Sequence, residues 1–171
     1  MNPINRTKGY TLIELTVVVF LIGIMLALSV PRFRYGLFSD TLKVATRRMI
    51  GTVKSLRNKA VQDQKAYRLH FDLESERLWI EWNQMTNEEQ AVARGKASGL
   101  RGGIRILDVC RTGKGKSDVG ETAIHFTKKG YVEQAVIHLG SDDGRAHTIE
   151  LSPFLGTIKT YDKYVEIETI L

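Results

Sequence analysis

Glu14 is the residue of this sequence whose position makes the clearest chemical demand. It is the one charged side chain in the apolar run 10–30 of a chain of 171 residues. A charge near the centre of a membrane helix costs about 2.5–3.5 kcal/mol on insertion scales, and a buried carboxylate is tolerated when a cation pairs with it. The placement of Glu14 in the first turn of this run therefore predicts a specific cationic partner.

The run 10–30 has the length of a transmembrane helix. As a helix it spans about 32 Å at about 1.5 Å per residue, against about 30 Å for the hydrocarbon core of a bilayer. Pro31 stands where the run ends. A secretory signal peptide with a poor cleavage site at 27–29 is the competing interpretation. The run is long for such a signal, and a signal peptide has no use for Glu14.

The beginning of the chain resembles the prepilin signature of type IV pilin-like proteins. A short basic leader, 1–9, ends in Gly9, an aromatic residue follows, and Glu14 stands four residues later in an uninterrupted apolar helix. The resemblance implies that a prepilin peptidase cuts between Gly9 and Tyr10 and N-methylates Tyr10. It also implies that Glu14 pairs with the Tyr10 amine of a neighbouring subunit during assembly. Gly23 and Pro31 stand where pilins often carry residues that loosen the helix.

A local role for Glu14 is the alternative to this contact between subunits. Residues 10 and 14 are about one helical turn apart, so Glu14 is also placed to cap the start of its own helix. We favour the contact between subunits. Basic residues stand on both sides of the run, so charge does not set its orientation. The resemblance implies a single pass through the bacterial inner membrane with the C-terminal domain in the periplasm.

The rest of the chain predicts an α+β fold, in which a helix packs on an antiparallel sheet or sandwich. An amphipathic helix is expected at 39–65, with Ser39 or Asp40 as its N-cap if the helix restarts after Gly36. Apolar residues recur on one of its faces: Ala45, Met49, Val53, Leu56 and Ala60. Alternating residues predict strands at 67–72, 77–82, 104–109, 123–127, 133–139, 147–151 and 164–170. The expected organisation is a leader (1–9), an apolar membrane and filament helix (10–38), an amphipathic helix (39–65) and a β domain (66–171).

A second, less specific resemblance concerns the end of the chain. The segments 149–153 and 156–159, after a helix and an early hairpin, resemble GspH/FimT-type minor pseudopilins and minor pilins. This implies a structural subunit of a type II secretion system, in a periplasmic filament that helps to export folded proteins. The implied partners are other pseudopilins through the N-terminal helix, the prepilin peptidase and the inner-membrane assembly platform. The alternative is a FimT-like minor type IV pilin that acts in pilus assembly or in DNA binding and uptake.

Two long polar connections, 83–103 and 111–121, are the expected places for partner contacts. The DNA alternative rests on basic residues in these connections and, for Arg105, in the strand predicted between them: Arg94, Lys96, Arg101, Arg105, Arg111, Lys114 and Lys116. Acidic residues in the same connections dilute their field, so nucleic acid is not the favoured partner. A third possibility is an ordinary secreted or membrane-tethered β domain with no role in a filament.

Other chemical patterns in the chain favour no catalytic or cofactor site. The segment 110–117 imitates a phosphate-binding loop, but it has Cys110 where that loop requires glycine. Cys110 is expected to be a buried structural thiol. The four histidines stand on separate predicted strands, and 141–144 is interpreted as a turn rather than a calcium loop. The expectation is a protein that is not an enzyme and has neither metal nor cofactor.

Overall fold

The computed structural model describes residues 11–100, 102–153 and 157–166, and the side chains of 27–40 are outside this description. The predicted cleavage site between Gly9 and Tyr10 is therefore outside it too. The chain divides into two compact units, Met1–Leu37 and Phe38–Leu171. Each unit is described by itself below.

Helix α1 (Leu12–Gln62) begins in the first unit and ends in the second. Its backbone is helical at Pro31 and through 36–40, so the helix does not restart there and no N-cap forms at Ser39 or Asp40. Within the described residues, no helix combines the length and the hydropathy that a membrane crossing requires.

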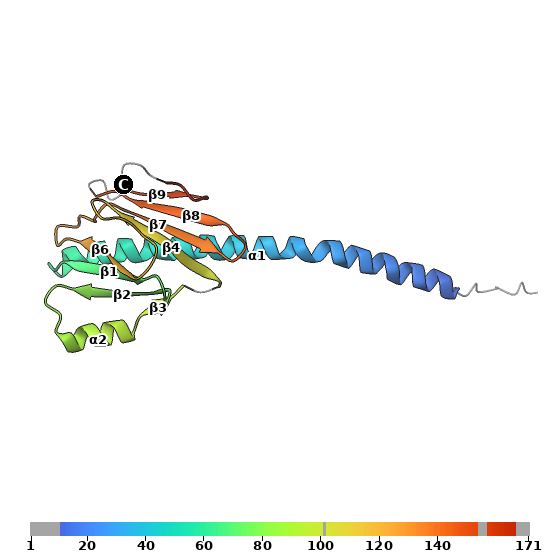
Figure 1. The fold of residues 1–171 in the computed structure, drawn as a ribbon, viewed down its shortest axis with the longest axis horizontal. Coiled ribbons are helices and arrows are strands. Elements are labelled where there is room, and N and C mark those ends of the chain that lie inside the picture. The colour runs from blue at the N-terminus through green and yellow to red at the C-terminus, as the bar shows by residue number, and fades with distance from the viewer. Residues whose placement is uncertain (1–10, 101, 154–156, 167–171) are drawn as a thin grey trace, which may run out of the picture. The chain divides into compact units, whose positions relative to one another are not determined.

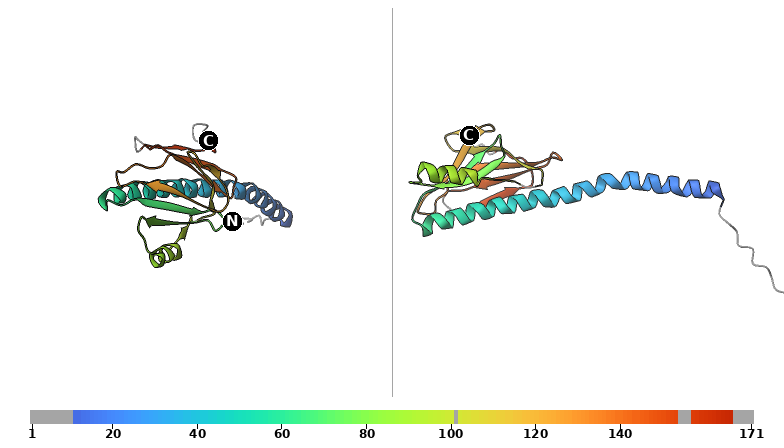
Figure 2. Two further views of the ribbon diagram at one scale, coloured as in Figure 1. Left: turned by 60° about the vertical axis from the view of Figure 1, so that its left-hand side comes forward. Right: turned by 90° about the horizontal axis from the view of Figure 1, so that it is seen from below.

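The second unit has its core between α1 and two antiparallel sheets (Figure 1). The sequence expectation of one apolar helix face is confirmed. The buried side chains of this face are Leu42, Ala45, Met49, Val53, Leu56 and Ala60. Both sheets lie on the same side of this part of α1, as the right-hand view of Figure 2 shows. The fold class is α+β, as the sequence predicts.

The first sheet has the strand order β3-β2-β1-β6, and the second has the order β5-β4-β7-β8-β9. The first contains β1 (Tyr67–Asp72), β2 (Arg77–Trp82), β3 (Ser98–Gly99) and β6 (Glu121–Phe126). The second contains β4 (Ile104–Arg111), β5 (Gly115–Ser117), β7 (Ala135–Ser141), β8 (Ala146–Leu151) and β9 (Ile158–Tyr161). The hairpin β1–β2 has the predicted bounds, and every pair of neighbouring strands is antiparallel.

Each predicted long connection contains regular structure. The first holds α2 (Asn87–Gly95) and β3, and the second holds β5. Helix α2 starts with a capping box: the Thr86 hydroxyl accepts from the Glu89 amide, and the Glu89 carboxylate accepts from the Thr86 amide. This cap satisfies two amide groups at the helix start, which explains a short helix that buries none of its residues.

The prediction of a strand at 164–170 is wrong for the residues that the structure describes. Residues 164–166 are not in a strand, and 167–170 are outside the described residues. The last strand is β9, which pairs with β8. Val165 is held by single hydrogen bonds instead, because its amide donates to Thr148 Oγ1 and its carbonyl accepts from His138 Nε2.

Candidate functional site

The start of α1 is capped by Thr11. Its hydroxyl lies 3.3 Å from the Glu14 amide and accepts a hydrogen bond from it. A Ser or Thr side chain that accepts from the third residue of a helix satisfies one of the amides left without a partner there. The sequence analysis missed Thr11, although its spacing from Glu14 is that of a capping box.

Glu14 is exposed on the first turn of the helix. Within the described residues, its carboxylate has no hydrogen bond and no ion pair. Thr11 caps the helix through the Glu14 backbone amide, and the Glu14 side chain takes no part in that bond. The pairing with the amine of Tyr10, in the same or another subunit, stays a prediction because Tyr10 lies outside the description.

Apart from Glu14 and Thr16, the first turns of α1 expose apolar side chains on all faces. The exposed side chains are Leu12, Ile13, Leu15, Val17, Val18, Val19, Phe20, Leu21, Ile22, Ile24, Met25 and Leu26. Their exposed fractions run from 83% at Leu12 to 43% at Ile24. A helix that is apolar all round belongs in lipid or inside a protein assembly. A Cβ at Gly23 would meet nothing within 4 Å, so packing in this chain does not require glycine there. The loosening roles of Gly23 and Pro31 stay predictions.

The basic residues of the two connections do not form one free surface. Arg94 projects from α2 to an ion pair with Glu121 at 2.8 Å, and its guanidinium lies 5.0 Å from the centre of the Trp79 ring. Lys116 lies 3.4 Å from Asp108, and its ammonium donates to the Tyr164 hydroxyl. These contacts neutralise much of the charge that a phosphate would meet.

The other basic residues differ in exposure. Arg111 ends β4 and is buried, so the expectation that it belongs to a solvent-facing loop is wrong; its guanidinium donates to the Ala123 carbonyl. Arg105 is exposed and lies 3.8 Å from Asp142. Lys96 and Lys114 are exposed, and Arg101 lies outside the described residues. Charge alone cannot show from sequence that an arginine at a strand end turns inward.

A buried cluster of polar side chains from β4 and β7 is the main site feature that sequence reasoning missed. His138 Nδ1 lies 2.6 Å from Asp108 Oδ1, and His138 Nε2 donates to the Val165 carbonyl. The Tyr164 ring stacks on His138 at 3.9 Å, and its hydroxyl donates to Asp108 Oδ2. Burial alone would raise the pKa of Asp108, but the hydrogen bonds and charges around it, those of His138 first, hold that pKa below its usual value.

The same cluster contains Cys110, Asp108 and His138, whose ligand atoms lie within 4.8 Å of one another. Both nitrogens of His138 already have protein partners, and Asp108 accepts from three groups. Burial, then Asp108, raises the pKa of the Cys110 thiol to about 11. A neutral thiol beside a satisfied ion pair is a poor metal ligand and a poor nucleophile. The expectation that Cys110 is buried is confirmed.

The two loop patterns set aside in the sequence are also turns in the structure. The segment 110–117 joins β4 to β5 as a hairpin, without the helix that a phosphate-binding loop requires. Residues 141–144 join β7 to β8. The carboxylate of Asp143 accepts hydrogen bonds from Arg145 and Ser141.

Comparison with known proteins addresses the two ends of this arrangement. The family described as the prokaryotic N-terminal methylation motif matches residues 4–30. The crystal structure of the minor pseudopilin EpsH from the type II secretion system of Vibrio cholerae is similar in fold, with a TM-score of 0.53 at 15% identity over 75% of this chain and 98% of that chain. The motif and the fold together support a type IV pilin-like assignment.

Further comparisons add little to this assignment. A second structure of the Vibrio cholerae minor pseudopilin EpsH has a TM-score of 0.48 at 14% identity, over 71% of this chain and 96% of that chain. Among curated proteins, none matches the sequence. The pilin-like assignment therefore rests on the methylation motif together with the fold of the β domain.

Proposed function

We propose that this pilin-like protein is a minor pseudopilin of a type II secretion system. The observation that carries the proposal is a conjunction: a methylation motif at 4–30 precedes a domain with the fold of a minor pseudopilin. Its role is structural, as one subunit of a periplasmic filament that helps to export folded proteins. No catalytic step is assigned to its side chains.

The proposed life of the subunit begins in the inner membrane. A prepilin peptidase cuts between Gly9 and Tyr10 and methylates Tyr10, and residues 10–30 anchor the chain with its β domain in the periplasm. The assembly platform then transfers the helix from lipid into a bundle of neighbouring helices. This transfer costs little free energy, because the apolar side chains leave one apolar environment for another.

Glu14 is the residue that makes the transfer specific. An exposed carboxylate in an otherwise apolar helix is a liability in both environments. The methylated amine of Tyr10 on a neighbouring subunit would pair with it and remove that liability. One such pair for each subunit sets the axial position of the helix in the filament.

Intact-mass measurement of the protein from membranes tests the first step. We expect a chain that begins at Tyr10 and carries one added methyl group, and loss of both features in cells without the prepilin peptidase. An unmethylated chain, or one cut near residues 27–29, would contradict the proposal.

A deletion strain then separates the proposed function from the pilus alternative. We expect folded exported enzymes to accumulate in the periplasm, while uptake of DNA stays at the level of the parent strain. Normal secretion combined with lost DNA uptake would instead establish a minor type IV pilin. Re-expression of the intact chain should restore secretion, and re-expression of a Gly9→Ala variant should not.

A further inference from the structure

The edge strand β2 is only partly covered. On one side it pairs with β1 along its whole length, but on the other side β3 pairs only with Arg77 and Leu78. The part of β2 from Trp79 to Trp82 therefore has no strand beside it on its outer side within the described residues. Proteins commonly protect such edges with proline, a bulge or a lysine, because free backbone groups invite another strand. This stretch of β2 carries none of the three, and its one charged residue is Glu81, which is buried beside His70.

The backbone of Ile80 points toward that open side. In an antiparallel pair the backbone groups of successive residues face alternately toward the partner strand and away from it. The Asn83 amide donates to Ala66, next to β1, whereas the Trp82 amide points away and lies 3.3 Å from Met85 Sδ. Two residues earlier in the strand, Ile80 has the orientation of Trp82. Its amide and carbonyl are thus directed to the uncovered edge.

Grooves lie on both sides of this edge. On one side, a hollow of about 610 Å³ lies between α1 and Ile80. An adjoining hollow of about 480 Å³ lies between α1 and the β3 segment with Ser98 and Leu100, and it reaches β2 only at Leu78. Both hollows include Arg48 and Thr52. On the other side, a hollow of about 560 Å³ lies between α2 and β2. Leu78 or Ile80 borders each of the three. The edge therefore lies between two grooves. We call the two hollows beside α1 the α1 groove and the hollow beside α2 the α2 groove.

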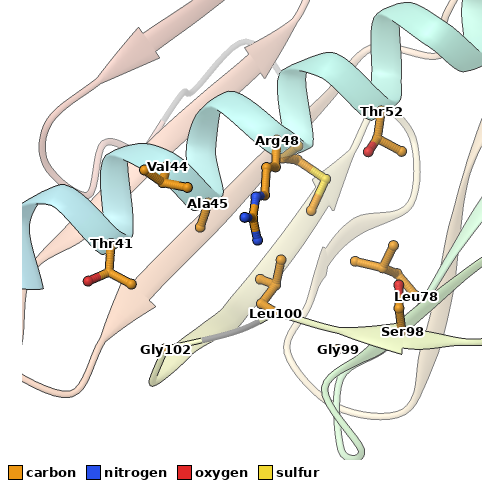
Figure 3. Close-up of a pocket in the computed structure, with 11 residues that line it drawn as sticks. Thr41, Val44, Ala45, Arg48, Thr52, Leu78, Ser98, Gly99, Leu100 and Gly102 are labelled. Atoms are coloured by element: carbon orange, nitrogen blue, oxygen red, sulfur yellow. The ribbon is translucent and has the colours of Figure 1, made fainter.

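The two grooves differ in chemistry. Arg48 projects from α1 into the α1 groove toward Leu100 (Figure 3), and Lys59 lines its far end. No carboxylate lines the α1 groove among the described residues, and Arg48 has no ion pair there. The α2 groove is mainly apolar, with Trp82, Met85 and the half-exposed Val92 in its wall. A segment lying along the edge would meet positive charge on one face and apolar side chains on the other.

We propose that the open edge of β2 binds an extended segment of another protein, which adds to the sheet as a strand. In this added strand acidic residues face Arg48 and Lys59 in the α1 groove, and alternate apolar residues enter the α2 groove. Side chains of a strand point alternately to its two faces, so this partner has a period-two pattern of acidic and apolar residues. Hydrogen bonds to the Ile80 backbone supply the pairing. The proposal holds whether or not the chain acts in secretion.

Hydrogen exchange at one amide tests the strand addition. The probe is a synthetic peptide of alternating valine and glutamate, and its control replaces each glutamate with lysine. Measured on the full chain in detergent micelles, the glutamate peptide should slow exchange of the Ile80 amide by about tenfold or more, as for one added hydrogen bond. The lysine peptide should have no such effect. Equal effects of both peptides, or no protection at Ile80, would overturn the proposal.

Two variants keep the test independent of any single substitution. Ile80→Pro removes the outward amide at a position where an edge strand tolerates proline, and it should abolish peptide binding, whereas Ile80→Ala should retain it. If Ile80→Pro does not fold, the double variant Arg48→Glu with Lys59→Glu should reverse the preference to the lysine peptide. An unchanged preference would sink the assignment of the acidic face. If the Ile80 amide becomes more protected as the protein concentration rises, with no peptide present, the edge binds a second copy of this chain. That result would overturn the proposal that it binds another protein.

Discussion

Thr46 and His147 join α1 to β8 through a buried hydrogen bond of 3.0 Å between Thr46 Oγ1 and His147 Nδ1. The Thr46 hydroxyl donates its single proton to the Leu42 carbonyl, so Nδ1 of the imidazole is the donor in this bond. In the neutral imidazole the bond therefore places the proton on Nδ1, and Nε2 lies 3.6 Å from Asp162. This pair ties the helix to the second sheet in an otherwise apolar layer.

Thr46→Val should destabilise the β domain without changing its fold. Valine has nearly the shape of threonine, but it leaves the buried Nδ1 proton of His147 without an acceptor. Such an orphaned group costs about 1–3 kcal/mol. Urea unfolding followed by tryptophan fluorescence measures the loss. Thr52→Val, at a half-buried position of the same helix, is the matched comparison and should cost less.

The stability of the domain should fall as the pH drops below about 6.5. Burial lowers the pKa of His147 from 6.5, and Asp162 offsets this only in part. The unfolded chain then binds a proton at a pH where the folded chain does not, so acid favours unfolding between the folded pKa and about 6.5. Burial lowers the pKa of His125 in the same direction. Midpoints of thermal unfolding at about pH 5 and about pH 8 measure the slope, which His147→Asn should reduce and His125→Asn should reduce separately.

Asp108→Asn should be among the most damaging single substitutions outside the apolar core. It removes the charge opposite His138 and one acceptor of the Tyr164 hydroxyl in a buried setting. Breaking one partner of a buried pair costs about 3–5 kcal/mol. Because the folded pKa of Asp108 is lowered, its contribution is present above its usual pKa of 3.8 and disappears as the pH falls through the folded value. Denaturant titration at neutral pH should show the loss, and Tyr164→Phe should show a smaller one.

Glu14→Gln should separate assembly from folding. The side chain of Glu14 has no partner within the described residues, so the thermal midpoint of the β domain should not change. We expect the variant to be processed and to stay in the membrane, yet to be absent from filaments. Immunoblots of sheared filaments and of membranes provide both readouts. Incorporation at the level of the unmodified chain would show that no pairing at Glu14 is needed.

DNA binding should be weak or absent, even at low salt. Arg111 is buried, Arg94 and Lys116 are paired with acidic residues, and only part of the predicted basic set is left to meet phosphates. Phosphate contacts would show a steep dependence on salt. Gel-shift titration of the full chain in detergent at two salt concentrations measures this. A shift at low salt that disappears at high salt would revive the alternative of a DNA-binding minor pilin.

Periodicity predicts the framework of this fold because the framework depends on local pattern. The helix face from Ala45 to Ala60 and the hairpin β1–β2 follow from spacings of about 3.6 and 2 residues. The same reasoning misses α2, because its sequence signal is the capping box of Thr86 and Glu89 at the helix start and not a periodic apolar face. It also places the last strand at 164–170 instead of at β9.

The polar cluster at Asp108 could not be predicted from spacing. A register shift between Ile106 and Asp108 in the pairing of β4 with β7 sets Asp108 opposite His138. A shift of one residue in pairing exchanges the side chains on the two faces of a strand. Nothing in the local sequence marks the position of this irregularity. Tyr164, which closes the cluster, stands in a segment that alternation assigns to a strand.

Helix α2 buries none of its residues, and the capping box at Thr86 stabilises its first turn. Its surface positions are therefore released from the packing constraints that hold the core, and related proteins can change them at little cost in stability. Val92 and Lys96 lie in the wall of the groove beside β2, so substitutions there alter what the groove recognises. A few changes on this helix and at its C-cap would let descendants of the same scaffold acquire different partners.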